Sequence, residues 1–253
     1  MKYSPKQFYL DYPPSKRKED TLFCKFIIRP LSFLFSSFFV FLGIGANAVS
    51  IISLLFSFIS CGFLIVFYFY NLYLFLYLSL ASFFVWAILD CVDGNIARSI
   101  KKEKYGDFLD AVAGYIYPGI FISLFGICAS RMNNIVFVEY NDILIVLAVV
   151  AGTSMITLIL ANKKFEENDK MYTSGQSENK KHTISFYSIA RRVWDELSFG
   201  GFMPLILLLA IIFDVSNLVA FFYSICFILM FILGMTYLIA KTILKNRAPT
   251  DNN

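Results

Sequence analysis

The chain has no charge over a long stretch near its start and almost no histidine. No Asp, Glu, Lys, Arg or His occurs in the sixty residues from Pro30 to Leu89. Because one helix needs only ~20 apolar residues to cross a bilayer, this run holds more than one membrane element. It starts too late and runs too long to be the apolar region of a cleaved signal peptide. The single histidine, His182, lies in a polar stretch, which argues against triad chemistry built on a core histidine.

Cysteine patterns and internal repeats are also missing. The five cysteines are scattered and form no CxxC pair, so neither a disulfide framework nor a zinc site is favoured. No repeat of ~20 to 50 residues is visible. Aromatic residues make up 18% of the chain, charged residues only 16%, and the mean hydropathy is +0.67. These values are typical of an integral membrane protein and exclude an ordinary soluble domain.

We expect an all-α, polytopic membrane protein with six transmembrane helices and an N-terminal interfacial helix. The expected spans cover residues 47–69, 72–97, 107–129, 141–161, 200–214 and 217–240. Segment 20–43 is predicted to lie at the membrane interface, within a cytoplasmic N-terminal segment of residues 1–46. The membrane domain then covers 47–244, and a cytoplasmic tail covers 245–253.

The cytoplasmic loop 162–199 is predicted to be polar over 163–186, and 187–198 could form a short amphipathic helix on the membrane surface. Lysine and arginine predict the orientation. Of the 22 basic residues, 21 precede the first span, follow the second or fourth span, or lie at the C-terminal end, which leaves only Arg131 on the other side. Both termini and the longer loops are therefore expected to be cytoplasmic. The net charge of +4 reflects this topology and attraction to anionic lipid, and needs no nucleic-acid partner.

Acidic residues cluster where the chain leaves the second expected span. Asp90 and Asp93 are three residues apart, so on a helix they share a face. Asp110 lies about one turn inside the next span, after a short connection that makes the two helices neighbours. Converging carboxylates repel or protonate unless a cation holds them. Hard oxygen ligands at a membrane face suit Mg²⁺ or Mn²⁺, which typically bridge to substrate phosphates.

Small and basic residues accompany these carboxylates. Gly94, Ala97 and Gly106 would let backbone approach a bulky ligand closely, and Arg98 is a permanent cation suited to phosphate oxygens. An isolated acidic residue at a helix end is usually a solvated cap. The combination of three acids, small residues and an arginine instead indicates chemistry on a phosphate or pyrophosphate.

The pattern Asp90-x2-Asp93-Gly94-x2-Ala97-Arg98, then seven residues, then Gly106-x3-Asp110 resembles the signature of the CDP-alcohol phosphotransferases (CDP-alcohol phosphatidyltransferases). That signature reads DxxDGxxAR, a spacer usually of eight, then GxxxDxxxD. The stretches RPLSFLF at 29–35 and LGIGANAVSIISL at 42–54 are similar to the region before the first span in many bacterial members.

The resemblance implies a six-helix membrane transferase that moves a phosphoalcohol from a CDP-linked donor to an acceptor with release of CMP. Family members carry two metal ions on four signature aspartates. By position, Asp90, Asp93 and Asp110 would be metal ligands, while Gly94, Ala97, Arg98 and Gly106 would form the site for the CDP moiety. The resemblance further implies phospholipid or surface-glycan synthesis at a bacterial inner membrane. Homodimers are common in the family.

The fourth signature aspartate, a metal ligand and proposed general base in the family, falls on Gly114 here, which would weaken the second metal site. Asp107 lies seven residues earlier, about 700° around the helix and so on nearly the same stripe, but ~10 Å away along the axis. Tyr115 and Tyr117 have ordinary pKa values near ~10, which is poor for a base at neutral pH. Glu196 could be brought in by folding. The catalytic base is therefore unknown, with Asp107 and Glu196 as weak candidates.

Two functions remain open from the sequence. The first is an active transferase with an altered base, for which an anionic acceptor such as a phosphate oxygen would lose least from the missing base. The second is a catalytically idle relative that binds a CDP-linked lipid or scaffolds a membrane biosynthetic complex. A transporter is disfavoured because the acids cluster at one edge. The basic pairs Lys163–Lys164 and Arg191–Arg192 fit positive-inside topology, or could receive a phosphorylated acceptor or lipid headgroups.

Overall fold

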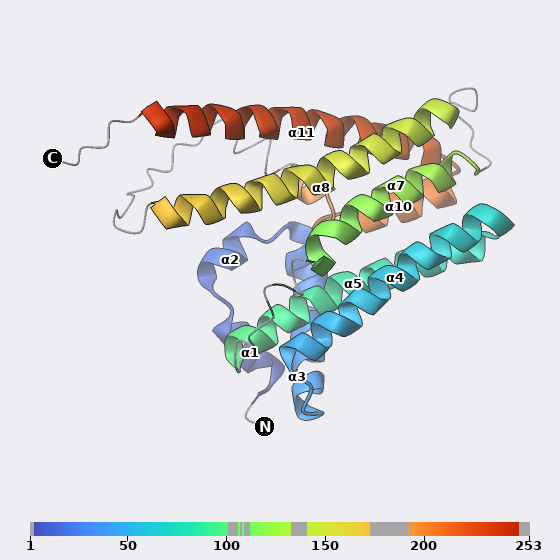
Figure 1. Ribbon diagram of the computed structural model, residues 1–253. Helices are drawn as coiled ribbons and strands as arrows, with labels where there is room; N and C mark the ends of the chain where they lie inside the picture. The colour runs from blue at the N-terminus through green and yellow to red at the C-terminus, as the bar shows by residue number, and fades with distance from the viewer. Residues whose placement is uncertain are drawn as a thin grey trace.

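A computed structural model describes residues 3–100, 106, 108, 112–132, 141–172, 192 and 194–247 of the 253-residue chain. Within these ranges the chain forms helices joined by turns, with no strand (Figure 1). The labelled elements are α1 (Pro5–Asp11), α2 (Pro14–Glu19), η1 (Cys24–Ile28), α3 (Arg29–Phe41), α4 (Ala46–Tyr70), α5 (Tyr73–Ser99), η2 (Val112–Ile116), α7 (Tyr117–Ala129), α8 (Asn141–Tyr172), α10 (Met203–Ile212) and α11 (Ser216–Arg247). The predicted all-α class is confirmed.

Long apolar helices confirm a polytopic membrane protein. Among the described residues, five helices are long and apolar enough to cross a bilayer: Cys24–Phe41, Ala46–Tyr70, Tyr73–Ser99, Asn141–Asn168 and Ser216–Ile243. The last four match predicted spans. The other two predicted spans contain the shorter apolar helices α7 and α10. The number of true crossings stays a prediction, as does the placement of residues 1–46, 47–244 and 245–253 relative to the membrane.

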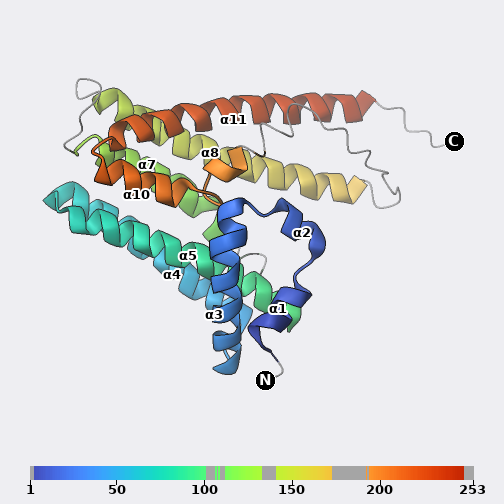
Figure 2. The same ribbon diagram turned by 180° about the vertical axis from the view of Figure 1, so that it is seen from behind.

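The helix Cys24–Phe41 falls in the segment predicted to be interfacial. Its length and composition are sufficient for a membrane span. Its direction differs from that of the other long helices, however, since α3 crosses the line of α4 and α5 steeply in both Figure 1 and Figure 2. The interfacial placement of this segment stays a prediction.

The helix α8 ends later than the sequence predicts. It continues to Tyr172, whereas the expected span ends at 161 and a polar loop was expected from 163. Residues such as Lys164 and Glu167 are good helix formers, and they pair across one turn at 3.6 Å. The start of the predicted loop is therefore wrong, because polar helix formers extend α8 beyond its apolar part.

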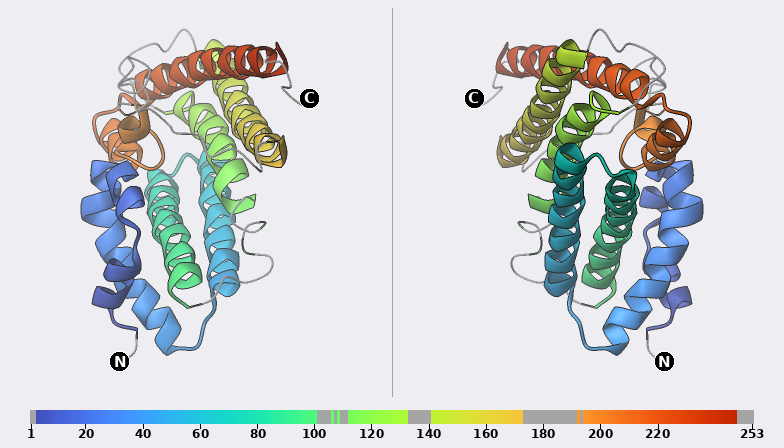
Figure 3. Two further views of the ribbon diagram at one scale, coloured as in Figure 1. Left: turned by 90° about the vertical axis from the view of Figure 1, so that its left-hand side faces the viewer. Right: turned by 90° about the vertical axis from the view of Figure 1, so that its right-hand side faces the viewer.

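Sharp turns make consecutive helices neighbours. Asn71 adopts φ 52° after α4, a left-handed conformation that asparagine tolerates, and α5 begins two residues later. The pair α4–α5 is therefore antiparallel, and it forms the centre of the fold. In Figure 3, α3 and α10 lie on the α5 side of this pair, whereas α7 and α8 lie on the α4 side. The carboxyl ends of α5, α8 and α11 all point toward the end where α1–α3 pack (Figures 1 and 2).

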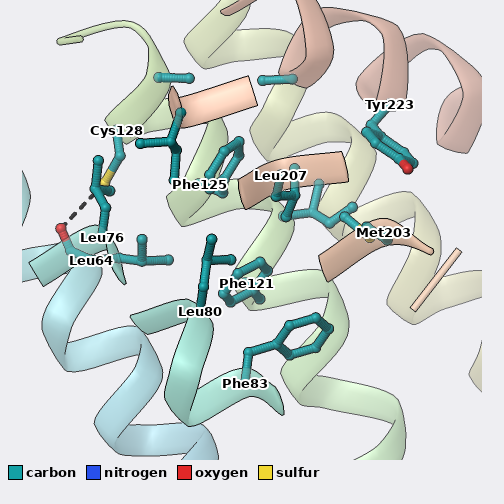
Figure 4. Close-up of a cluster of buried hydrophobic side chains, with 14 of the residues drawn as sticks. Leu64, Leu76, Leu80, Phe83, Phe121, Phe125, Cys128, Met203, Leu207 and Tyr223 are labelled. Atoms are coloured by element: carbon teal, nitrogen blue, oxygen red, sulfur yellow. Dashed lines mark hydrogen bonds between the residues drawn. The ribbon is translucent and has the colours of Figure 1, made fainter. Parts of the chain in front are cut away.

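Aromatic side chains build the main core between α4, α5, α7 and α10. The Phe83 ring stacks on Phe121 with a centroid separation of 4.8 Å and on Trp86 at 5.5 Å, and Phe83 and Phe121 are completely buried. Leu64, Leu207 and Met203 fill the space around these rings (Figure 4). Stacked rings of this kind contribute ~0.5–1.5 kcal/mol per pair beyond their buried area. This core fixes α5 relative to α7.

Glycine lets α7 and α8 pack at backbone distance. A Cβ added to Gly119 would lie 2.6 Å from the carbonyl oxygen of Gly152, and one added to Gly126 would overlap Ala148 Cβ. The Ser123 hydroxyl donates to the Ala148 carbonyl across the same contact at 3.3 Å. Membrane helices associate through such small-residue contacts, because lipid offers no hydrophobic driving force.

Candidate functional site at the carboxyl end of α5

The carboxyl half of α5 carries the first half of the predicted site. Its apolar face buries Ile88, Leu89, Val92 and Ile96 against Ala46 and Val49 of α4 and residues of η1. This packing fixes the rotation of α5 and therefore the direction of the carboxylates. Asp90 is half-buried, while Asp93 is only 6% exposed.

A serine of α4 holds the buried carboxylate. The Ser50 hydroxyl donates to Asp93 Oδ2 at 2.6 Å, and it also lies 3.2 Å from the Ala46 carbonyl oxygen. A hydrogen bond to a charged group is worth about 1.5–3 kcal/mol. The sequence analysis did not identify Ser50 as a site residue. The available signal was its place in a row of serines at helical spacing, with Ser53, Ser57 and Ser60, all of which are buried.

Gly114 faces the other carboxylate. A Cβ built on Gly114, in η2, would lie 3.9 Å from Asp90 Oδ1, an ordinary van der Waals separation. The position where the sequence pattern leads one to expect a fourth acid is thus directed at Asp90, with room for a small side chain. Folding brings together the two ends of the predicted signature, although 24 positions separate them.

Arg98 folds back over Gly94. A Cβ on Gly94 would lie 3.1 Å from one terminal nitrogen of the guanidinium and 3.3 Å from the other, so the absence of a side chain lets Arg98 cover this turn. Arg98 Nη2 donates to Asn95 Oδ1 at 2.9 Å. Ala97 is half-buried against the cluster around Val92. Gly94, Ala97 and Arg98 are therefore together on one helical segment, as predicted.

Gly106, which follows α5 in the sequence, lies against the start of α4 in space. A Cβ on Gly106 would come 3.3 Å from Asn47 Oδ1, which is closer than most Cβ contacts. Asn47 follows the first residue of α4 and lies one turn before Ser50. The start of α4 therefore contacts Gly106 as well as Asp93. The sequence analysis did not predict the contact between Asn47 and Gly106.

The remaining predicted acids have different outcomes. Asp107 and Asp110 lie outside the described residues. Glu196 is described, and both its carboxylate oxygens accept from the Leu22 backbone N–H, at 3.0 and 2.8 Å. The same carboxylate pairs with Arg192 at 3.5 Å. Glu196 thus binds the N-terminal segment, which makes it a poor candidate for a free base.

The carboxylate oxygens of Asp90 and Asp93 are candidate ligands for a divalent cation. Within the residues that the structure describes, no group of three or more His, Cys, Asp or Glu gathers at one point. Two carboxylates one helical turn apart, one of them held by Ser50, and open space at Gly114 beside Asp90 nevertheless fit a hard cation bound through oxygen. Asp110 would supply the third carboxylate.

Paired carboxylates and an arginine at one end of a membrane helix suit a site for phosphate-bearing ligands. Comparison with known families identifies the family: residues 44–191 match CDP-alcohol phosphatidyltransferase, and the chain belongs to that family. Membership of this family gives the general class of the protein, a membrane transferase of phospholipid biosynthesis. No curated protein and no solved structure matches the chain.

Proposed function

We propose that this protein moves a phosphoalcohol group from a CDP-linked donor to an acceptor and releases CMP, at the cytoplasmic face of a bacterial inner membrane. The product would be a phospholipid or a related lipid or surface glycan. The observation that carries the proposal is the approach of Gly114 to Asp90, with a built Cβ 3.9 Å from the carboxylate. It supports a site of the family type that lacks one carboxylate, at the position where the family has its proposed general base.

On the donor side, Asp90, Asp93 and Asp110 would hold Mg²⁺ or Mn²⁺, two ions in the family pattern. When bound, the metal would polarise the pyrophosphate and stabilise charge on the departing CMP. Ser50 would orient Asp93. Arg98 is exposed and presents a planar set of donors to phosphate oxygens, while Gly94, Ala97 and Gly106 leave space for the CDP moiety. The acceptor oxygen attacks the phosphorus of the phosphoalcohol, and the bond from this phosphorus to the CMP oxygen breaks.

On the acceptor side, no base stands at position 114. A general base typically contributes ~10²- to 10⁴-fold, so a neutral hydroxyl acceptor would react slowly. An acceptor that is already anionic has no proton to lose at the attacking oxygen. We therefore propose a phosphate oxygen as the acceptor, which would join the two groups through a new pyrophosphate bond. A transfer rate that is flat with pH around neutrality is expected. A clear ascending limb lost in Asp107→Asn would instead identify a substitute base.

The test is CMP release by the purified full chain, supplied with a panel of CDP-linked donors and with neutral and phosphorylated acceptors. Release should require Mg²⁺ or Mn²⁺ and should disappear in Asp93→Asn. Asp142→Asn is the matched control, because Asp142 is an exposed acid at the start of α8. Release that never exceeds a metal-free control with any donor and acceptor would overturn the proposal.

Gly114 also favours a second candidate, a catalytically idle relative that binds a CDP-linked lipid or scaffolds a biosynthetic complex. This candidate predicts metal-dependent CDP binding without turnover. It further predicts that cells carrying Asp110→Ala behave normally. An active transferase predicts the opposite result in both measurements.

A further inference from the structure

The N-terminal helices form a separate layer against the site. Residues 3–41 precede the segment that matches the family, which begins at residue 44. In the structure, α1 packs on α3, and both pack on α5 (Figure 2). Most of this layer therefore lies outside the segment that matches the family.

The ring of Tyr12, the residue just after α1, contacts the guanidinium groups of two arginines. Its ring is 3% exposed, and it lies 4.2 Å from the Arg29 guanidinium carbon and 5.3 Å from that of Arg98. Both distances are within the ~6 Å range of cation–π attraction. Burial raises the pKa of the Tyr12 hydroxyl well above its usual range, so Tyr12 stays neutral and donates to Asp20 Oδ1 at 2.9 Å.

Asp20 pairs with one of the two arginines, Arg29. It accepts from Arg29 Nε at 3.1 Å and from Arg29 Nη2 at 3.0 Å, a bidentate pair that compensates the Arg29 charge. Arg98 has no such carboxylate pair: its hydrogen bonding within the described part of the chain goes to Asn95. Of the two cations on the Tyr12 ring, Arg29 is hydrogen-bonded to a carboxylate, whereas the exposed Arg98 is hydrogen-bonded to the neutral amide of Asn95.

Asn95 connects Arg98 to α3. The Asn95 side chain is 2% exposed, and its Nδ2 donates to Ser32 Oγ at 3.1 Å and to Ser36 Oγ at 3.3 Å. These two bonds orient the amide so that its oxygen points to Arg98. The exposed guanidinium is thus held by a buried amide on one side and by the Tyr12 ring on another.

We propose that Tyr12 and Asn95 are positioning residues that hold the Arg98 guanidinium ready for the phosphate groups of a cytidine diphosphate ligand. This role rests on the proposed function for the identity of the ligand. Holding Arg98 in advance lowers the ordering cost of binding, because a free arginine side chain loses much rotamer freedom when it binds.

The first experiment measures CDP affinity of the full chain in detergent with Mg²⁺. Tyr12→Leu should weaken binding by roughly 2- to 30-fold, the range of one cation–π contact. Tyr12→Phe keeps the ring and should restore most of the affinity. Tyr9→Leu is the matched control: the Tyr9 ring contacts Arg17 at 4.1 Å in the same way, but away from the signature.

A double-mutant cycle separates positioning from folding. In an Arg98→Ala background, Tyr12→Leu should weaken CDP binding no further, because the ring acts through the guanidinium. Asn95→Ala provides a second variant with Tyr12 intact, and it should weaken binding in the same Arg98-dependent way. Equal losses with and without Arg98, or affinities equal to wild type in both variants, would overturn the proposal.

A second measurement does not depend on CDP. Phenylglyoxal modifies accessible guanidinium groups, and peptide mass spectrometry reports its rate at Arg98. The rate should rise in Tyr12→Leu and Asn95→Ala and stay unchanged in Tyr9→Leu. If the wild type fails to bind CDP while the Arg98 rates change as expected, the proposed ligand is wrong but the positioning contacts stand. Unchanged Arg98 rates would overturn the positioning role itself.

Discussion

The Ser50 hydroxyl on α4 donates a 2.6 Å hydrogen bond to Asp93 Oδ2 on α5. Only 6% of Asp93 is exposed, so the serine replaces water that the carboxylate would otherwise bind. The relationship couples the first helix of the family match to the signature on the second. It also sets the direction of one carboxylate before any cation arrives.

Removing the Ser50 hydroxyl should therefore weaken the metal site. Partners that orient metal ligands typically contribute about 10- to 100-fold in metal affinity or activity. Ser50→Ala is expected to raise the Mg²⁺ concentration needed for half-maximal CMP release or CDP binding by about that factor. Ser57→Ala is the control, because the buried Ser57 hydroxyl donates to the Leu54 carbonyl of its own helix. An unchanged Mg²⁺ dependence in Ser50→Ala would contradict the assigned role.

Restoring an acid opposite Asp90 should change the enzyme in two ways. In Gly114→Asp, the Cβ that carries the new carboxylate would lie 3.9 Å from Asp90 Oδ1. Without metal the like charges repel, so the melting temperature should fall, and Mg²⁺ should recover it. With a neutral hydroxyl acceptor, CMP release should rise, by up to ~10²- to 10⁴-fold if the acid serves as a base.

The control for this substitution is Gly114→Ala, whose Cβ fits at ordinary contact distance and adds no charge. It should show neither the Mg²⁺-dependent recovery nor the gain in rate. If Gly114→Asp melts at the same temperature with and without Mg²⁺, its carboxylate does not share a cation with Asp90.

The close packing of α7 on α8 should tolerate no added methyl group. Gly119→Ala would place a Cβ 2.6 Å from the Gly152 carbonyl oxygen, so the helices must separate. Overpacking of this kind costs about 1–3 kcal/mol. Heating followed by size-exclusion chromatography should show a lower midpoint for Gly119→Ala than for Gly62→Ala, since a Cβ at Gly62 meets nothing within 4 Å. Equal midpoints would mean that the two helices are not in backbone contact.

The contact between residues 192–200 and the N-terminal segment should protect that segment from protease. Arg192 donates to the backbone carbonyls of Lys18, Glu19 and Asp20 at 3.0, 3.1 and 2.8 Å. Arg192→Ala should therefore speed tryptic cleavage after Lys18. Lys164→Ala also removes one positive charge but breaks only an exposed pair, and it should leave the cleavage rate unchanged. Equal rates in both variants would show that Arg192 does not restrain the segment.

Much of the fold was accessible from the sequence because apolar runs are local signals. The spans around α4, α5, α8 and α11 follow directly from hydropathy. The end of α8 was misjudged because hydropathy marks the edge of the apolar region, whereas polar helix formers continue the helix beyond it. The direction of α3 could not be read from its composition, since the same residues suit a span or an interface.

The residues of the candidate site also divide into those that local spacing predicts and those that depend on contacts between helices. Asp90, Asp93, Gly94, Ala97 and Arg98 lie within nine positions of one helix, so their spacing alone places them together. Ser50, Asn95 and Tyr12 were missed as functional residues because their roles depend on contacts between helices. The hydrogen bond from Ser50 to Asp93 spans 43 positions, and no local pattern specifies it. The prediction for Asp110 as a metal ligand stays a prediction, and Gly114 remains the residue on which the acceptor chemistry depends.

The contact between Leu22 and Glu196 can form only late in the synthesis of the chain. The two residues are 174 positions apart, so the N-terminal helices leave the ribosome long before their partner exists. At about 5–20 residues per second, that interval is roughly 9–35 s. During this time Tyr12 and Arg29 are present but not yet secured by residues 192–200. The segment around Leu22 is therefore locked in place late, after four of the six expected spans have left the ribosome.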